Sequence, residues 1–481
     1  MPLEFQRMDT TPPSVTVPVP PPDSTVGRNP VISARFADAG AGIDTSSARI
    51  LLDGRDRTRQ AKVTSEGFTL RPQNPLERGV HRVEVTVSDR AGNQSNRLSW
   101  RFGVDIPVPV TARFDKGMFL VNDAPFFPMG IYNYSCNPGG SMFDEFVLAQ
   151  VTAAGYNCLL YNEGSSESLE ILQKHGMKAL LRVNRGLEAS TDLHKAKEAL
   201  VDKGPVRWKE HPALLAYWAD SPDAVFYHAK YSREDSLRRM TLGYQTLREN
   251  DLTHPAIWCF AHRDTFKDYI GTSDALMTFF YPIGQADFTV SSVSDIMIRP
   301  AMEAATTKQV WFISQAIDLT LDREGKKPAP ADFRPTPAQM RAMNYLALVE
   351  GVKGLIIYAS GGSSKPGVYN NLVEYPAQWQ EALKMAGEVR YLSPVLAVGK
   401  PARTVNLEPE EVKKAIRFRE LVHHRHHYLI AVNVTETPVS VNWRFAQPVQ
   451  PIVLFEDRRW VEKAVAMPDT FQPYEVHIYR W

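Results

Sequence analysis

Hydrophobic and polar positions change their period twice along the chain. Between Val31 and Val87, short runs alternate apolar and polar residues, and turn signals such as Asp53-Gly54 separate them. Alternation with a period of two is typical of half-buried strands, and several short strands at this spacing predict a β-sandwich. The prolines before Val31 disfavour helix there, because each removes a backbone donor. We expect an N-terminal sandwich over residues 1–106.

From about Phe127, buried-looking strands alternate with amphipathic helical segments, which predicts βαβ units around a parallel sheet. Thr336, Pro337 and Gly351 mark the start and end of one such helix. Eight strands fit a closed (β/α)8 TIM barrel. An open doubly wound sheet is the alternative. Such a sheet typically has a glycine-rich phosphate loop after an early strand, and the segment after the first predicted strand does not have this pattern. The predicted strands are 127–133, 156–162, 177–184, 214–220, 256–260, 275–281, 310–315 and 354–360.

Alternation returns after Pro401 and predicts a small C-terminal sandwich over residues 399–481, which leaves 107–398 for the barrel. The predicted fold class is therefore α/β, a TIM barrel with a β-sandwich on each side. The histidine-rich segment 423–427 lies at a predicted hairpin turn. Consecutive side chains there alternate between the two faces, so we expect a solvated turn rather than a metal site.

Composition excludes several classes of function. The 481 residues are 43% hydrophobic and 23% charged, with a formal net charge of +1. This near-neutral balance gives no field that would attract nucleic acid or an anionic membrane. No apolar run approaches the ~20 residues that span a bilayer. The three cysteines, Cys136, Cys158 and Cys259, are too few and too scattered for a disulfide framework or a metal site, so we expect buried thiols.

Candidate chemistry gathers where the predicted barrel strands end, which is where enzymes with this fold place their active sites. The residues there are rich in aromatic rings, carboxylates and amides. A sugar offers hydroxyls to carboxylates and amides and an apolar face to aromatic rings, so this set suits carbohydrate, although it also lines many unrelated pockets. The residues are Tyr132, Asn133, Asn162, Glu163, Arg182, Asn184, Trp218, Asp220, Asp223, His262, Arg263, Tyr281, Gln315, Tyr358 and Ser360.

Residues 119–132, which read FLVNDAPFFPMGIY, resemble the segment that leads into the first strand of clan A glycoside hydrolases and their uncharacterised bacterial relatives. The agreement continues through 154–157, 211–223 and 351–354, and it covers the chain from about residue 113 to its end. Residues 38–54 resemble bacterial immunoglobulin-like (Ig-like) modules of secreted enzymes. The resemblance implies a carbohydrate-active barrel that hydrolyses O-glycosyl bonds without a cofactor.

The location is open from the sequence. The start, Met1 to Phe5, lacks the charged-then-apolar pattern of a signal peptide. Either the protein is cytoplasmic or a signal has been removed, and we favour a secreted or periplasmic protein.

The chain departs from these relatives at both catalytic positions. Their fourth strand ends in Asp-Glu-Pro or Asn-Glu-Pro, and this Glu would be the general acid/base; here the position is Ser221. A serine hydroxyl is too weak an acid to protonate a leaving group near neutral pH. The second Glu, the nucleophile after strand seven, is replaced by Gln315, although uncharacterised relatives often carry Gln there.

Hydrolysis of a glycoside ordinarily needs two carboxyl groups, ~5 Å apart for retention and ~6.5–9.5 Å apart for inversion. Glu163 and Asp220 end strands that are two apart, so their backbones would lie roughly 10 Å apart at ~4.8 Å per strand. We therefore predict Asp220 and Glu163 as a non-standard catalytic pair. The predicted substrate contacts are Tyr132, Asn133, Arg182, Trp218, Ser221, Tyr281, Gln315 and Tyr358.

Simpler structural roles compete with this hypothesis. Segment 220–223 could cap the next helix, and Glu163 could be a solvated loop residue. Gln315 could be a buried, hydrogen-bonded amide, and Trp218 could belong to the barrel core. For the whole protein, the alternatives are a carbohydrate-binding pseudoenzyme that has lost hydrolysis, and a scaffold whose sandwiches mediate contacts. The sequence does not predict the sugar, the linkage or the oligomeric state.

Overall fold

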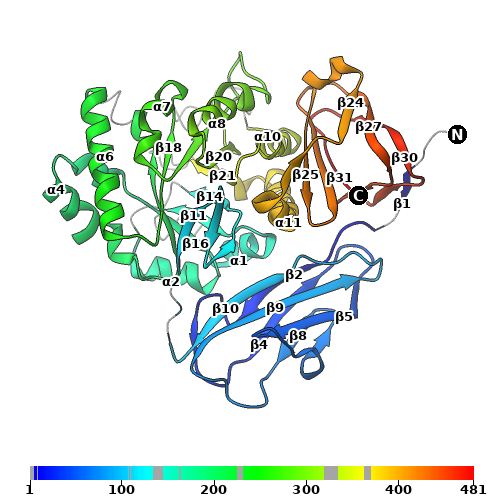
Figure 1. Cartoon of the computed structure of the whole chain (residues 1–481), viewed down its shortest axis with the longest axis horizontal. Helices are drawn as coiled ribbons and strands as arrows, with labels where there is room; N and C mark the ends of the chain where they lie inside the picture. Colours follow the sequence, from blue (N-terminus) through cyan, green and yellow to red (C-terminus); the bar gives the residue numbers. More distant parts are fainter. Residues whose placement is uncertain are drawn as a thin grey trace.

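The computed structural model shows a barrel with one β-rich body beside it and another below it (Figure 1). The chain starts close to the C-terminal sheets, crosses the lower body, forms the barrel and returns to the C-terminal sheets. The structure describes residues 5–7, 9–106, 108, 110–133, 145–161, 164–224, 231–318, 334–361 and 370–481.

Eight parallel strands form the barrel, and the first pairs with the eighth, so that the sheet closes. Side chains such as Cys158, Leu180, Ile257 and Ile356 fill its interior. The strands are β14 (Met129–Asn133), β15 (Cys158–Tyr161), β16 (Lys178–Arg182), β17 (Leu214–Asp220), β18 (Ala256–Phe260), β19 (Ala275–Phe279), β20 (Val310–Gln315) and β21 (Gly354–Gly361).

Helices connect these strands on the outside of the barrel (Figure 1). In α10, Thr336 caps the first turn by accepting a hydrogen bond from the backbone of Gln339, and Pro337 occupies the first helical position. The helix ends at Gly351, whose φ of 103° is left-handed, so all three predicted signals are confirmed. The principal helices are α1 (Glu145–Ala154), α2 (Ser166–Lys174), α3 (Asn184–Ala189), α6 (Arg233–Asn250), α8 (Arg299–Ala305), α10 (Pro337–Glu350) and α11 (Pro376–Val398).

Two sheets form the N-terminal sandwich, with the orders β2-β4-β8-β7 and β3-β10-β9-β5-β6. Alternating residues such as Ile32, Ile50, Val85 and Phe102 face each other in a dry core. The strands are β2 (Ser14–Val19), β3 (Thr25–Val26), β4 (Ile32–Ala37), β5 (Ile43–Leu52), β6 (Arg55–Asp56), β7 (Lys62–Thr64), β8 (Gly67–Leu70), β9 (Gly79–Asp89) and β10 (Leu98–Val104).

The C-terminal sheets have the orders β1-β29-β28-β31-β26-β25-β23 and β24-β27-β30. One face of the larger sheet, with Leu421 and Ile430, joins the same apolar core as α10 and α11. The strands are β1 (Phe5–Arg7), β23 (Lys400–Ala402), β24 (Val405–Glu408), β25 (Ile416–His423), β26 (His426–Asn433), β27 (Val439–Val449), β28 (Ile452–Val453), β29 (Arg458–Trp460), β30 (Ala464–Phe471) and β31 (Val476–Arg480).

The predicted fold class, a TIM barrel flanked by an N-terminal Ig-like β-sandwich and a small C-terminal β-sandwich, needs correction outside the barrel. Strand β1 pairs antiparallel with β29, so the N-terminal segment completes the C-terminal sheet rather than the N-terminal sandwich. A separate sheet of β11 (Ala112–Asp115), β12 (Met118–Val121) and β13 (Ala124–Pro125) belongs to neither sandwich. An alternating pattern identifies a strand but not its partner, because any edge strand offers unpaired backbone groups. The predicted domain boundaries, at residues 106 and 398, stay predictions.

Candidate active site at the barrel mouth

Three strand ends bring a tyrosine, an arginine and an aspartate together. Tyr132 lies near the end of β14, Arg182 ends β16 and Asp220 ends β17. The Tyr132 hydroxyl donates to Asp220 Oδ2 at 2.8 Å, and Arg182 Nη2 donates to the same oxygen at 3.0 Å. Parallel strands of a barrel present their carboxyl ends at one rim, which is why residues so far apart in sequence meet here.

Asp220 is arranged as a hydrogen-bond acceptor. Its second oxygen, Oδ1, lies 3.1 Å from the Ser221 hydroxyl, which donates to it. Tyr132, Arg182 and Ser221 thus all donate a hydrogen bond to this carboxyl group. The Asp220 side chain is 15% exposed, so it is held firmly and still reaches solvent.

Hydrogen bonds also hold the backbone of Asp220 at the end of β17. Asn184 Oδ1 accepts from Asp220 N at 2.8 Å, and Asn184 Nδ2 donates to Asp220 O at 2.7 Å. Ser221 follows with a φ of 46°, a left-handed conformation that costs a non-glycine residue conformational energy. The chain therefore turns sharply after Asp220, and Asn184 holds that turn in place.

A row of aromatic rings runs beside the carboxylate. The Tyr132 ring meets Trp218 edge-on at 5.2 Å between ring centres and stacks on Tyr358 at 4.9 Å. Tyr358 stacks on Tyr281 at 5.4 Å, and Tyr281 stacks on Phe279 at 5.0 Å. Phe279 was not among the predicted site residues, although it lies two residues before Tyr281 in the predicted strand 275–281, a spacing that places both side chains on one face. The rings form an apolar wall beside the polar cluster.

Two predicted substrate contacts, Gln315 and Trp218, are buried and have polar atoms that bond within the protein. Gln315 is fully buried: its Oε1 accepts from Ile283 N at 3.0 Å, and its Nε2 donates to Ile283 O at 2.9 Å. Trp218 is 1% exposed, and its indole N–H donates to Tyr161 O at 2.9 Å. Gln315 holds the loop after β19 and Trp218 packs in the barrel interior, and their roles as substrate contacts stay predictions.

Asp223 is also structural. It is fully buried, and its carboxylate accepts backbone hydrogen bonds from Ala261 and His262 and one from the Thr265 hydroxyl. These bonds hold the turn after β18. Cys259 lies in the barrel interior; burial raises the pKa of its thiol well above the usual range, and Asp220 and Asp223 add to the shift. A thiol in this state is not a nucleophile.

Several predicted residues are not placed. Glu163 lies outside the described residues, so its pairing with Asp220 stays a prediction. For Asn133 and Ser360 only the backbone is described. The segments 134–144, 162–163, 225–230, 319–333 and 362–369 are likewise outside the described set, and in the sequence they come after β14, β15, β17, β20 and β21. The predicted residues that the structure brings together are Tyr132, Arg182, Asn184, Trp218, Asp220, Ser221, Tyr281 and Tyr358.

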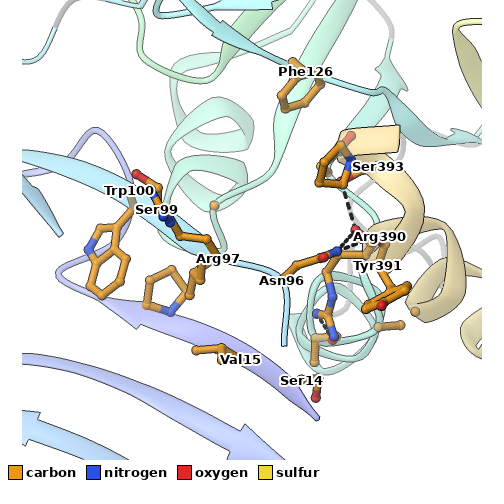
Figure 2. Close-up of a pocket in the computed structure, with 18 of the residues that line it drawn as sticks. Ser14, Val15, Asn96, Arg97, Ser99, Trp100, Phe126, Arg390, Tyr391 and Ser393 are labelled. Carbon is orange, nitrogen blue, oxygen red and sulfur yellow. Dashed lines mark hydrogen bonds between the residues drawn. The ribbon is translucent and has the colours of Figure 1, made fainter. Parts of the chain in front are cut away.

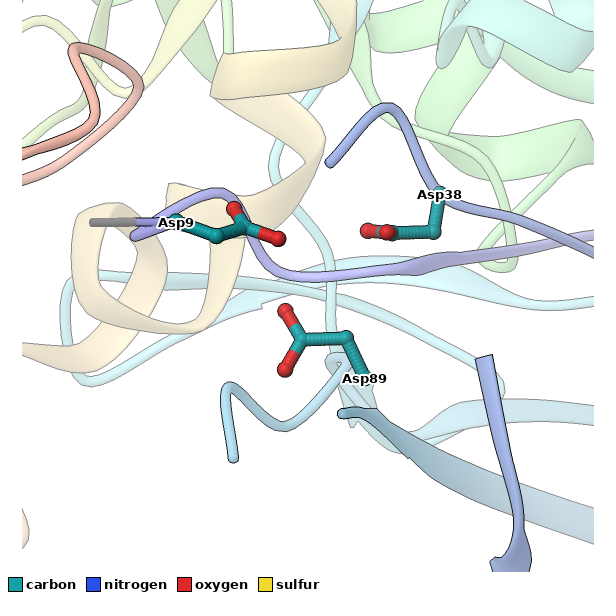
Figure 3. Close-up of side chains that lie close together, drawn as sticks. All are labelled: Asp9, Asp38 and Asp89. Atoms are coloured by element: carbon teal, nitrogen blue, oxygen red, sulfur yellow. The ribbon is translucent and has the colours of Figure 1, made fainter. Parts of the chain in front are cut away.

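Three carboxylates converge elsewhere, in the N-terminal sandwich (Figure 3). Oxygens of Asp9, Asp38 and Asp89 lie within 4.8 Å of one another, and this is the single group of three or more possible metal ligands in the described part of the chain. Backbone amides already occupy many of these oxygens: Thr11 N donates to Asp9 at 2.9 Å, and Gly42 N donates to Asp38 at 2.6 Å. The cluster thus has a structural role in holding the loops together.

Comparison with known families assigns the N-terminal sandwich. Residues 34–106 match the family model of the bacterial Ig-like domain. The N-terminal sandwich is therefore similar to a bacterial Ig-like domain, and we refer to it as the Ig-like domain. No curated protein matches the chain in sequence.

Among solved structures, one described as a glycoside hydrolase is 13% identical, covers 77% of this chain and 96% of its own, and superposes with a TM-score of 0.52. At this identity the likeness shows the fold alone. A β-galacturonidase from Eisenbergiella tayi (14% identity, 75% and 69% coverage) and a β-glucuronidase from Lactobacillus rhamnosus (16%, 77% and 64%) give TM-scores of 0.44 and 0.41. Within the described residues, no helix combines the length and hydrophobicity needed to cross a bilayer.

Proposed function

We propose that the barrel mouth binds a carbohydrate and hydrolyses an O-glycosidic bond, with Asp220 as the central carboxylate. The observation that carries the proposal is the cluster of Tyr132, Arg182 and Asp220 at three strand ends. The fold shared with a structure described as a glycoside hydrolase supports it. The Ig-like domain supports the further proposal of a location outside the cytoplasm.

In this proposal Asp220 acts as an acceptor, which the three hydrogen bonds that it accepts support. A carboxylate held by three donors can accept a hydrogen bond from a sugar hydroxyl, take a proton from an attacking water, or stabilise positive charge on the sugar. It is poorly arranged to donate a proton, because Tyr132, Arg182 and Ser221 all point hydrogen atoms at it. The acid must therefore come from another residue, and Glu163 is our candidate.

A second candidate function is carbohydrate binding without hydrolysis. Its specific support is that Ser221 stands where related enzymes are expected to carry the acid, while the Gln315 amide is occupied by the backbone. Among the described residues, Asp220 is the one carboxylate in this cluster.

Binding to a glycan array and hydrolysis of the bound glycans, followed by reducing-sugar release, test the proposal and separate the two functions. Release of sugar from a bound glycan supports hydrolysis, and binding without release supports the pseudoenzyme. Absence of both would contradict a carbohydrate function at the mouth.

Restoring an acid probes the same question. We expect Ser221→Glu to place a carboxyl group beside Asp220 and to create or raise hydrolysis at least ~10-fold, because general acid catalysis contributes on the order of 100-fold or more. Ser221→Gln is the matched control, since it has the size of Glu but no acid. Equal rates for the two variants would show that the position no longer supports catalysis.

A further inference from the structure

A cavity, which we call the junction cavity, lies where the Ig-like domain, the barrel and α11 meet. Its volume is about 1170 Å³. Figure 2 shows Ser99 and Trp100 of the Ig-like domain on one side and Arg390, Tyr391 and Ser393 of α11 on the other. Asn96 crosses between them, and its side-chain amide donates to the carbonyls of Arg390, at 2.9 Å, and Tyr391.

The junction cavity is distinct from the barrel mouth. On the barrel side it is lined by Asn157, just before β15, and by Lys178, the first residue of β16. These positions lie at the amino ends of the strands, whereas Asp220 lies at the carboxyl end of β17. A ligand in the cavity would therefore lie at the opposite end of the barrel from the proposed catalytic cluster.

Positive charge predominates around the junction cavity. Six Lys and Arg residues line it against three Asp and Glu residues; Arg97 is paired with Glu84, and Asp9 and Asp89 lie beside the lining Asp38. Such a local excess at a concave surface attracts anions. The nine residues are Arg82, Arg97, Arg101, Lys178, Lys384, Arg390, Asp23, Asp38 and Glu388.

One part of this excess is buried. Asp23 is 5% exposed, and its two oxygens are shared between Arg101 Nε, at 2.9 Å, and Lys178 Nζ, at 2.7 Å. The two cations therefore share one buried carboxylate beside the cavity. Charge in such a sheltered place is weakly screened by solvent, so it acts strongly on a bound anion.

Arg390 supplies the second positive centre. Its Nη1 donates to Ala153 O at the end of α1 at 2.8 Å, and no acidic side chain among the described residues pairs with it. Burial lowers the pKa of the guanidinium to about 10. A guanidinium presents five N–H donors in a planar fork that suits a carboxylate or sulfate, and one of those donors is used here.

We propose that the junction cavity binds an acidic oligosaccharide, whose carboxylate or sulfate group pairs with Arg390. The identification as a saccharide rests on the proposed function of the barrel; the charge of the ligand rests on the cavity alone. Leu98, Phe126, Leu383 and Pro394 give the cavity apolar walls against which the faces of sugar rings can pack. Pockets of ~300–1,000 Å³ hold drug-sized ligands, so this one has room for two or three rings.

Calorimetric titration of the full chain tests this assignment. The probes are an alginate trisaccharide, which bears carboxylates, a heparin disaccharide, which bears sulfates, and neutral maltotriose. We expect at least one acidic probe to bind about 10-fold or more tightly than maltotriose, because charge-assisted hydrogen bonds are the stronger kind. Equal affinity for the neutral and acidic probes, or no binding of either acidic probe, would overturn the proposal.

Variants place the binding in the cavity. Arg390→Ala is expected to lower the affinity for the acidic probe about 10-fold or more. Arg390→Lys, which keeps the charge, should lower this affinity less. Ser99→Trp fills the cavity from the Ig-like side without touching Arg390 and should abolish binding. Arg444→Ala is the control, since it removes an exposed arginine of the C-terminal sheets and should change nothing. Unchanged binding in Arg390→Ala and Ser99→Trp would refute the site.

The variant Asp220→Asn distinguishes the proposed function at the barrel mouth from the proposed ligand site in the junction cavity. It lies in the barrel mouth, so acidic-probe binding in the cavity should survive this substitution. Loss of acidic-probe binding in Asp220→Asn alone would move the ligand to the mouth and overturn the junction site while leaving the mouth proposal intact. Binding that depends on Arg390, in a protein with no carbohydrate function at the mouth, would refute the proposed function and keep the junction site.

Discussion

At the scale of single residues, the arrangement around Asp220 decides what chemistry the barrel mouth can perform. Three donors from β14, β16 and the turn after β17 converge on one carboxylate. This makes Asp220 a rigid acceptor beside an aromatic wall. The same carboxylate in a mobile loop would not be preorganised, and preorganised charge is what distinguishes a catalytic group from a surface one.

Tyr132→Phe tests the contribution of one donor. The variant keeps the ring that packs against Trp218 and Tyr358 and removes only the hydroxyl that donates to Asp220. We expect hydrolysis or glycan affinity to fall roughly 10-fold, the effect of one hydrogen bond to a charged group. Tyr474→Phe, which removes an exposed hydroxyl bonded to Glu436, is the matched control. If both variants change hydrolysis or glycan affinity equally, the hydrogen bond from Tyr132 to Asp220 has no specific role at the site.

Residue roles were only partly predictable from the sequence. The ends of the strands identified Tyr132, Arg182 and Asp220 as neighbours, because strand order in a closed barrel follows chain order. A buried amide was one of the alternatives for Gln315, but its partner could not be predicted, since Ile283 is a loop residue 32 positions away. The carboxylates of the Ig-like domain were missed because Asp9, Asp38 and Asp89 lie far apart in sequence.

At the scale of elements, strands and helices followed local pattern closely. The predicted strands 214–220, 256–260 and 310–315 coincide with β17, β18 and β20. The predicted strand 275–281 is too long, since β19 ends at Phe279 before the turn that Gln315 holds. The pairing of β1 with β29 was beyond the sequence, because backbone pairing across more than 450 residues leaves no local signal.

Gly351 at the end of α10 offers a test at this scale. Its φ of 103° disfavours any side chain, and an added Cβ would meet the guanidinium of Arg419. We expect Gly351→Ala to lower the free energy of unfolding by about 1–2 kcal/mol. Gly271→Ala is the control, because nothing lies within 4 Å of the added carbon there. Urea unfolding followed by circular dichroism measures both, and equal stabilities would show that this cap is unimportant.

At the scale of the whole molecule, a buried charged network ties the C-terminal strands together. His477 is 1% exposed and lies 2.9 Å from Asp469 and 3.3 Å from Glu475. Burial disfavours its charged form, but the hydrogen bonds to these carboxylates prevail and raise the pKa of His477 to about 9 from the ordinary 6.5. The folded protein therefore binds a proton that the unfolded chain releases near neutral pH.

The consequence is a stability that depends on pH. A raised pKa in the folded state contributes fully below pH 6.5 and is lost as the pH rises through about 9. We expect the free energy of unfolding to fall by roughly 2 kcal/mol between pH 7 and pH 10. In His477→Gln this part of the fall should vanish. Urea unfolding at both pH values measures these free energies. An equal fall in the free energy of unfolding from pH 7 to pH 10 in the unaltered protein and in His477→Gln would refute the role of His477.

The same scale links the two proposed sites. The barrel carries the Asp220 cluster at the carboxyl ends of its strands and the junction cavity at their amino ends. A long acidic polysaccharide could then be held at one end of the barrel while a neighbouring chain is processed at the other. The Ig-like domain is in this arrangement a part of the binding surface, joined to α11 through Asn96.

The most direct test of the central claim is the rate at which Asp220→Asn hydrolyses the glycan that the array identifies. Asp264→Asn serves as its partner, since Asp264 follows β18 at the same rim and its side chain is 92% exposed. We predict that Asp220→Asn loses at least ~100-fold in rate, as expected for a group that acts in the transition state, while Asp264→Asn keeps the rate of the unaltered protein. Full activity in Asp220→Asn would contradict the assignment of Asp220 as the central carboxylate.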